Sequence, residues 1–240
     1  TSQEAVLIES TISDLKKKKS YSMQDIRDNI ESSNAQQEVK NIASSLFKAA
    51  ESWGIFSSSE EGTSILDLIN AGETTILDLS VYSSTGAFNV RALAIGLISR
   101  KLFAHRIEER KKEELKSIQH GQDYLSYTKR DSPLVWLFID EAHEFLPRDE
   151  KTPATEALVQ LLREGRQPGI SMVLATQQPG QIHKDVMTQS DIVISHRVTS
   201  QPDIEALKQI MQTYLLKKKK KKMDELPSLK GSAIILDDNS

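Results

Sequence analysis

The 240-residue sequence has no cysteine, few aromatic residues and no long apolar run. Without cysteine the chain can form neither a disulfide nor a zinc site with thiolate ligands. No uninterrupted apolar stretch approaches the roughly 18 residues that a membrane-spanning helix requires. We therefore expect a chain that does not enter a membrane and that works in a reducing, cytoplasmic compartment. The net charge of −3 excludes a uniformly basic nucleic-acid coat, so any DNA contact must come from local loops.

A phosphate-binding loop of the pattern G-x-x-x-x-G-K-[ST] is also absent from these residues. In nucleotide-binding proteins such a loop surrounds the phosphates with backbone N–H groups and brings a lysine to them. The absence is informative because another part of the chain has the pattern of a nucleotide site.

That part is residues 134–139, six mostly branched or aromatic apolar residues followed directly by Asp140 and Glu141. A continuous apolar run of this length predicts a strand buried on both faces, as in the middle of a parallel sheet. Open α/β sheets bind ligands beyond the carboxyl ends of their strands, which is where the two carboxylates would lie. This is the pattern of a Walker B segment, in which Asp140 serves Mg²⁺ and Glu141 polarises a water molecule. The alternative is that the two acidic residues only cap the next helix.

The alternation of elements predicts the fold class. Apolar residues recur at helical spacing before residue 53, with Ser22 and Asn34 as expected caps of the second and third helices. Strands are predicted from residue 74 onward, at 74–80, 134–139, 170–175, 192–198 and 232–236, with helices between them. Such alternation is typical of one parallel sheet with helical crossovers. We predict an α/β fold, with a helical subdomain at residues 1–73 and the sheet domain at residues 74–240.

Other polar residues are predicted to lie near the carboxylates. Thr176 and Gln177 follow the strand at 170–175 and would share the edge of the sheet with Asp140 and Glu141. A neutral amide there can sense a γ-phosphate, although ordinary turn chemistry before Pro179 is the alternative. His143 could contact a phosphate or form a local hydrogen bond, and the local hydrogen bond is the favoured interpretation.

Three arginines are candidates for contact with a phosphate. Arg166 lies in a turn between Gly165 and Gly169, where an arginine at a subunit edge could reach a neighbour's γ-phosphate. A surface salt bridge is the alternative. Arg163 and Arg197 compete for the same role, and Arg197 is expected within a strand, where an arginine needs a partner or a phosphate.

Taken together, five stretches resemble the HerA/FtsK superfamily of ring-forming P-loop ATPases, most closely the HerA-type DNA translocases of archaea and bacteria. The likeness covers about residues 62–240. It is carried by residues 75–80 (TILDLS), 138–147 (FIDEAHEFLP), 163–169 (REGRQPG), 174–179 (LATQQP) and 190–198 (SDIVISHRV).

The resemblance implies a RecA-like core that binds ATP and Mg²⁺, assembles as a hexameric ring and moves duplex DNA through its channel. It also implies a NurA-type nuclease partner in DNA-end processing. On this basis Asp140 serves Mg²⁺, Glu141 is the catalytic carboxylate, Gln177 senses the γ-phosphate and Arg166 acts on a neighbour's nucleotide. Thr176 and Arg197 are carried over as nucleotide-binding residues.

Cationic side chains in the loops after the two central strands would face the channel of such a ring. They are candidate contacts to DNA phosphates, with plain surface charge as the alternative. The candidates are Arg148, Lys151 and Lys184. The lysine runs 16–19 and 217–222 have no interleaved aromatic residues, so we interpret them as solvated segments.

The superfamily's phosphate loop precedes the helical insertion, so we expect that loop upstream of Thr1 and no appreciable ATP hydrolysis by these residues alone. Three alternatives remain. A conjugative or secretion ATPase would share the site, and a non-catalytic ring-assembly domain would not need its carboxylates. The sequence Asp-Glu-Ala-His at 140–143 also matches the DEAH helicase box, but the second helicase lobe does not fit into the residues that follow.

Overall fold

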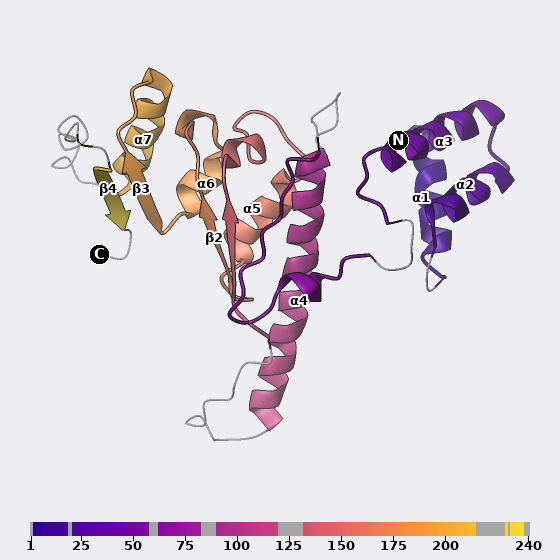
Figure 1. Ribbon diagram of the computed structural model, residues 1–240, viewed down its shortest axis with the longest axis horizontal. Coiled ribbons are helices and arrows are strands. Elements are labelled where there is room, and N and C mark those ends of the chain that lie inside the picture. Colours follow the sequence, from indigo (N-terminus) through magenta and orange to yellow (C-terminus); the bar gives the residue numbers. More distant parts are fainter. Residues whose placement is uncertain are drawn as a thin grey trace. The chain divides into compact units, whose positions relative to one another are not determined.

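The computed structural model describes residues 2–18, 21–57, 62–82, 90–119, 132–214, 229 and 231–237. The chain divides into two compact units, Thr1–Asp67 and Leu68–Ser240, and each is described here by itself (Figure 1). The boundary between them precedes the predicted one at residue 74. The lysine run 217–222 and the predicted loop at 120–131 lie outside the described residues.

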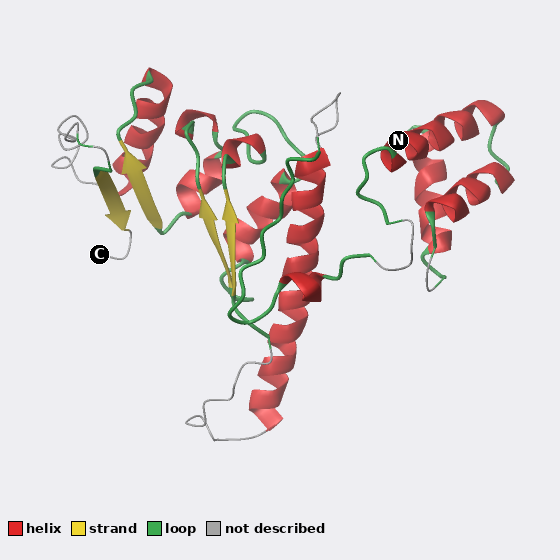
Figure 2. Ribbon diagram, viewed as in Figure 1, coloured by secondary structure: helices red, strands yellow, loops and turns green. Residues whose placement is uncertain are grey.

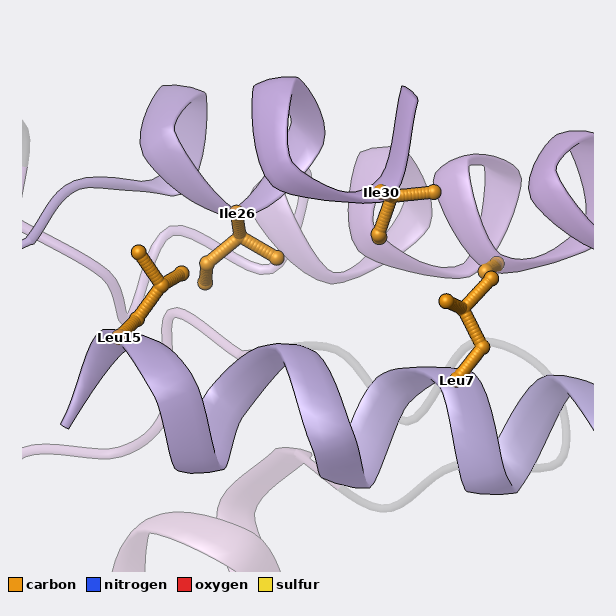
Figure 3. Close-up of a cluster of buried hydrophobic side chains, with 5 residues drawn as sticks. Leu7, Leu15, Ile26 and Ile30 are labelled. Carbon is orange, nitrogen blue, oxygen red and sulfur yellow. The ribbon is translucent and has the colours of Figure 1, made fainter. Parts of the chain in front are cut away.

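The first unit is helical, as the apolar spacing predicted. Its helices are α1 (Gln3–Leu15), α2 (Met23–Ser32) and α3 (Gln37–Glu51). They pack against one another in all three pairs and enclose one small apolar core (Figure 3). The buried members of that core are Leu7, Leu15, Ile26, Ile30 and Ala43.

Local hydrogen bonds define where α2 begins. The Ser22 hydroxyl accepts from the backbone N–H of Asp25 at 3.2 Å, and the Asp25 carboxylate accepts from the Ser22 N–H at 2.8 Å. This reciprocal pair is a capping box, which satisfies two N–H groups that the first helical turn leaves open. Ser22 is therefore the cap that the sequence predicted, whereas α3 is preceded by Gln36 rather than by Asn34.

The second unit alternates helices and strands along the chain (Figure 2). The short 3₁₀ turn η1 (Ile65–Leu68) spans the boundary between the units. The elements that follow are α4 (Val90–Gln119), β1 (Val135–Ile139), η2 (Ala142–Glu144), α5 (Thr155–Glu164), β2 (Ile170–Leu174), η3 (Pro179–Gln181), α6 (Lys184–Gln189), β3 (Ile192–His196), α7 (Gln201–Tyr214) and β4 (Ala233–Asp237).

β1 and β2 form a parallel pair in which Val135 lies opposite Ile170 and Ile139 opposite Leu174. Helices flank this pair, since α5 packs against β2, α4 and α6. The predicted α/β class, with parallel strands between helices and a helical first unit, is thereby confirmed. One parallel sheet of all the predicted strands is wrong for the described residues, because β3 pairs antiparallel with β4 in a separate two-stranded sheet (Figure 1).

The predicted burial of β1 on both faces is also wrong. Trp136 is 63% exposed and Phe138 is 69% exposed, and their rings stack with centroids 6.2 Å apart. The apolar run was interpreted from its length, but burial on both faces requires layers on both sides. Among the described residues, β1 has one neighbouring strand and one covered face.

Residues 74–80 do not form the predicted strand either. The chain has no regular secondary structure there before a turn at Ser80, and Ile76 is 86% exposed. The Asp78 carboxylate accepts from the Ser80 N–H at 2.9 Å, and the Tyr82 N–H donates to the Leu79 carbonyl. Local bonds of this kind compete with a strand ladder for the same backbone groups.

Close packing of α4 against the segment before α5 positions the central strands. At Gly96 an added Cβ would lie 2.6 Å from the Pro153 carbonyl oxygen, so only glycine permits this approach. On α5 the residues Ala157, Leu158 and Leu161 are buried, at the spacing of one helix face. None of the helices in the described part of the chain is long and apolar enough to cross a membrane.

The capping box generates a pH-dependent prediction. Hydrogen bonds from Ser22 hold the pKa of the Asp25 carboxyl below its ordinary value of 3.8. Because the folded pKa is the lower one, the stabilisation is complete above the ordinary value and is lost as pH falls through the folded value. We expect Asp25→Asn to accelerate amide hydrogen exchange in α2 at pH 7 and to abolish the loss of protection on acidification.

The matched control is Glu31→Gln, which removes the same charge from the last turn of α2 and leaves the capping box intact. It should leave the exchange of α2 unchanged or slow it slightly. Equal exchange rates in the two variants would contradict the assignment.

Candidate functional site

Two pairs of polar residues meet where β1 and β2 end. Past the strands the Ala175 N–H donates to the Ile139 carbonyl and the Ala142 N–H donates to the Ala175 carbonyl, both at 2.9 Å. These bonds hold the segment after β1 against the segment after β2. The parallel register thus brings Asp140 and Glu141 beside Thr176 and Gln177.

Glu141 has an unusual backbone conformation. Its φ of 47° and ψ of 45° lie in the left-handed region, and among the described residues it alone has a positive φ without being glycine. A side chain in this region costs about 1 kcal/mol or more, so the surrounding bonds must hold it there. The Asp140 Oδ1 accepts from the Glu141 N–H at 2.9 Å, and the Glu141 Oε1 accepts from the Gln177 Nε2 at 2.7 Å. The turn places the Glu141 carboxylate beside the Gln177 amide, across the ends of the two strands.

His143 lies behind this pair. Its Nδ1 is 3.0 Å from the Thr176 Oγ1 and 3.5 Å from the Glu141 Oε2. Its Nε2 is 3.3 Å from the Gln178 Nε2, and the Gln178 N–H donates to the Thr176 Oγ1 at 3.0 Å. His143 therefore has the local hydrogen bonds that were favoured from the sequence. The Thr176 hydroxyl, predicted as a nucleotide ligand, is engaged by this network, and the Gln178 side chain was not singled out from the sequence.

The loops after β1 and β2 are joined to each other. The His183 N–H donates to the Leu146 carbonyl at 2.7 Å, and the Arg148 N–H donates to the Gln181 carbonyl at 2.8 Å. Arg148 is exposed on the first of these loops, and Lys184 is exposed at the start of α6, directly after the second. Lys151 is exposed as well, but its Nζ lies 3.8 Å from the Glu156 carboxylate.

Arg166 lies at the other end of the strand pair. It is exposed in the turn before β2, and Gly169 in that turn accepts from the N–H of Val135 at the start of β1. Five strand residues at about 3.3 Å each separate this end from the carboxylates by roughly 16 Å. Arg166 therefore cannot reach Glu141 of its own chain. Beside Arg166 is a cavity of about 480 Å³, lined also by Phe103, Ile107, Arg163, Glu164 and Gln167.

The two competing arginines differ from Arg166. Arg163 is paired with the buried carboxylate of Asp185, with Nη2 and Oδ2 2.6 Å apart. Arg197 was expected inside a strand, and this is wrong: β3 ends at His196, and Arg197 follows it as an exposed residue. Because Arg197 is exposed, its charge is solvated by water and does not require a bound phosphate as a partner.

Arg106 is a structural residue that the sequence reasoning missed. It is 1% exposed on α4, and its Nε donates to the Pro168 carbonyl at 2.9 Å in the turn that carries Arg166. Its position on the same face as Ala92, Ser99 and Leu102 was the available signal, because an arginine in an apolar stripe needs a buried acceptor.

The described residues contain no cluster of three or more histidine, aspartate or glutamate side chains that could hold a metal ion. A closed metal cage is therefore not formed by this part of the chain. A nucleotide-bound Mg²⁺ needs only one or two carboxylates, which Asp140 and Glu141 could supply.

Comparison with known proteins shows the family of this chain. Residues 84–225, more than half of the chain, match the model of the Zonular occludens toxin (Zot) family. The chain belongs to the Zot family. The matched segment includes β1, β2 and both pairs of polar residues at their ends.

Curated relatives of this Zot-family chain are helicases. It is 27% identical over 144 residues to the DNA double-strand break repair helicase HerA of Pyrococcus furiosus, a match that covers 58% of the chain and 24% of the relative. It is 26% identical over 152 residues to the probable DNA double-strand break repair helicase HerA of Methanocaldococcus jannaschii, covering 56% of the chain and 30% of that relative. The chain therefore resembles the HerA-type members of the HerA/FtsK superfamily, and it spans 24% and 30% of the length of these two relatives.

Among solved structures, the chain is similar to the genome packaging NTPase B204 of Sulfolobus turreted icosahedral virus 2 in complex with sulfate. The TM-score is 0.45 at 16% identity, and the match covers 75% of this chain and 68% of that one.

The buried arginine of α4 can be tested by substitution. We expect Arg106→Ala to lower the free energy of unfolding of the second unit by about 2–4 kcal/mol, because it leaves a cavity and deprives the Pro168 carbonyl of its donor. Native-state hydrogen exchange of the β1 and β2 amides measures this change.

The matched control is Arg100→Ala on the same helix. Arg100 is exposed and lies 3.7 Å from the Glu156 carboxylate, so its loss should cost less than about 0.5 kcal/mol. A similar cost for both variants would refute a special role for Arg106.

Proposed function

We propose that this chain supplies the catalytic carboxylates of an ATP-driven DNA translocase of the HerA type. One observation carries the proposal: the Glu141 carboxylate is held 2.7 Å from the Gln177 amide at the carboxyl ends of two parallel strands, beside Asp140. In α/β folds this edge is where ligands bind.

The arrangement suits attack of water on a γ-phosphate. Glu141 orients the water and accepts its proton as the oxygen attacks phosphorus, and the bond from phosphorus to the bridging oxygen breaks to release ADP. Gln177 donates a hydrogen bond without adding charge, so its amide can turn from the carboxylate to the γ-phosphate when ATP is present. The α- and β-phosphates need a nest of backbone N–H groups such as the G-x-x-x-x-G-K-[ST] loop provides, and the 240-residue sequence lacks that pattern.

Asp140 suits a Mg²⁺ ion in this site. Its carboxylate is exposed, and one oxygen accepts the Glu141 N–H while the other has no hydrogen-bond partner among the described residues. A hard carboxylate oxygen with room for water molecules is the donor that Mg²⁺ takes in nucleotide sites. When bound, the ion would neutralise charge on the phosphate oxygens.

The position of Arg166 supports action between subunits. The residue is exposed and lies at the far end of the strand pair from Glu141 of its own chain. An arginine so placed can stabilise the transition state only in a neighbouring subunit, as in a hexameric ring with ATP at its interfaces. Thr176 and Arg197 stay proposed nucleotide contacts. Thr176 would donate its hydroxyl hydrogen while its oxygen stays beside His143, and Arg197 would act as an exposed charge.

The DNA-related part of the proposal rests on the relatives. Both HerA relatives are named as DNA double-strand break repair helicases, so we assign duplex DNA as the cargo and DNA-end processing as the setting. A NurA-type nuclease partner is what the resemblance of the motifs implies. A secretion or conjugation ATPase of the same superfamily is the alternative with the same site. A ring-assembly domain without catalysis is less compatible with a carboxylate held in a strained backbone conformation.

The role of Glu141 gives a direct test. In the full-length polypeptide that contains these residues, we expect Glu141→Gln to lower ATP turnover at least about 100-fold, because an amide cannot accept the proton of the attacking water. Steady-state hydrolysis with and without duplex DNA measures this, and DNA should stimulate the wild type.

The isosteric control is Glu144→Gln, three residues further on, where the side chain pairs with Arg91 at 3.0 Å. Its turnover should stay within about twofold of the wild type. Turnover that persists in Glu141→Gln would overturn the catalytic assignment, and turnover by the 240 residues alone would overturn the need for an additional phosphate loop. Turnover without DNA stimulation would argue against translocation.

The joined loops predict a second measurement. We expect the double substitution Arg148→Ala and Lys184→Ala to weaken binding of duplex DNA equally for all sequences and to reduce the slope of log affinity against log salt by about two, roughly one per phosphate contact. Fluorescence anisotropy at several salt concentrations gives both quantities.

Lys48→Ala, an exposed lysine of α3 in the helical unit, is the control for loss of charge alone. The same reduction of the slope in this variant would refute a specific contact by the loops.

A further inference from the structure

The His143 imidazole lies within reach of the Glu141 carboxylate and of two side chains that follow β2. It follows β1 in the turn η2, yet its imidazole faces two residues that follow β2. The contacts are Nδ1 to the Thr176 Oγ1 at 3.0 Å, Nδ1 to the Glu141 Oε2 at 3.5 Å, and Nε2 to the Gln178 Nε2 at 3.3 Å. The ring is half-buried, with 17% of the side chain exposed.

The chemistry of these partners determines which ring nitrogen carries the proton. An amide nitrogen only donates, so the Nε2 of His143 must accept from Gln178. A neutral imidazole that accepts at Nε2 has its proton on Nδ1. That proton points to the Thr176 oxygen and to the second carboxylate oxygen of Glu141.

The two oxygens of Glu141 are therefore approached by two donors from different elements. The Gln177 amide donates to Oε1, and the Nδ1–H of His143 faces Oε2. A glutamate side chain has several rotatable bonds, so a single hydrogen bond leaves its carboxylate free to swing, whereas two donors define its plane. The longer of the two contacts is of the kind that tightens when substrate is bound.

We propose that His143 is a positioning residue for ATP hydrolysis: through Nδ1–H, supported by Thr176 and Gln178, it holds the plane of the Glu141 carboxylate while Gln177 exchanges that carboxylate for a γ-phosphate. The inference rests on the function proposed above. It assigns to His143 a task that Gln177 cannot perform alone, since the amide must leave Glu141 in order to reach the nucleotide.

Three substitutions of His143 test this role in the full-length polypeptide. His143→Ala removes both nitrogens, His143→Asn places an amide N–H near the position of Nδ1, and His143→Gln places one near the position of Nε2. We expect kcat to fall roughly 10- to 100-fold in the Ala and Gln variants, because a misplaced base loses rate on that scale. The Asn variant should recover most of the wild-type kcat, and KM for ATP should stay within about twofold in all three.

The split between kcat and KM, with rescue by Asn alone, is a result that a merely structural role would not produce. His143→Gln at the wild-type rate, or His143→Asn as slow as His143→Ala, would overturn the proposal. His105→Asn on α4, outside the site, is the matched control and should leave kcat unchanged.

The proton position is a second readout that needs no turnover. Nitrogen-15 NMR of the 240-residue chain should show the Nδ1–H form of His143, and Gln178→Ala should reduce the share of that form. The Nε2–H form in the wild type would overturn the assignment.

The two proposals fail in different ways. Loss of turnover in Glu141→Gln together with wild-type kcat in every His143 variant would refute the positioning role and leave the proposed function standing. Full turnover in Glu141→Gln would refute the catalytic site itself.

Discussion

The site depends on the parallel pairing of β1 with β2. Two parallel strands in register end at the same edge, and here their backbone bonds continue past the ends to Ala142 and Ala175. Because of this continuation, residues 140–143 and 176–178 lie together although more than thirty positions separate them along the chain. The left-handed turn at Glu141, the amide of Gln177 and the imidazole of His143 all take their positions from it.

The same pairing separates two groups of candidate site residues in space. The acidic end of the strand pair carries the groups that would act on the chain's own nucleotide, and the opposite end carries Arg166 on a turn anchored by buried Arg106. A rigid strand pair keeps these ends about 16 Å apart. On the proposed function, Arg166 would therefore act on the nucleotide of a neighbouring subunit rather than on that of its own chain.

Much of this arrangement could be predicted from the sequence. The apolar run before Asp140 predicts a strand, and the rule for parallel sheets places Gln177 beside Glu141 from the sequence alone. Ser22 was recognised as a cap because its bonds are to residues three positions away. The failures concern Trp136, Ile76 and Arg197, whose exposure depends on what other segments cover. An apolar pattern states that a residue can be buried, and packing decides whether it is.

The sequence by itself determined the type and order of most elements and the residues at the ends of β1 and β2. These features depend on periodicity, capping and turn chemistry, which act over a few neighbouring residues. Only the tertiary structure decided the antiparallel pairing of β3 with β4, the two-sided approach to the Glu141 carboxylate and the burial of Arg106. Each of these depends on which distant segment comes to lie alongside, and that is set by packing over the whole unit rather than by local preference.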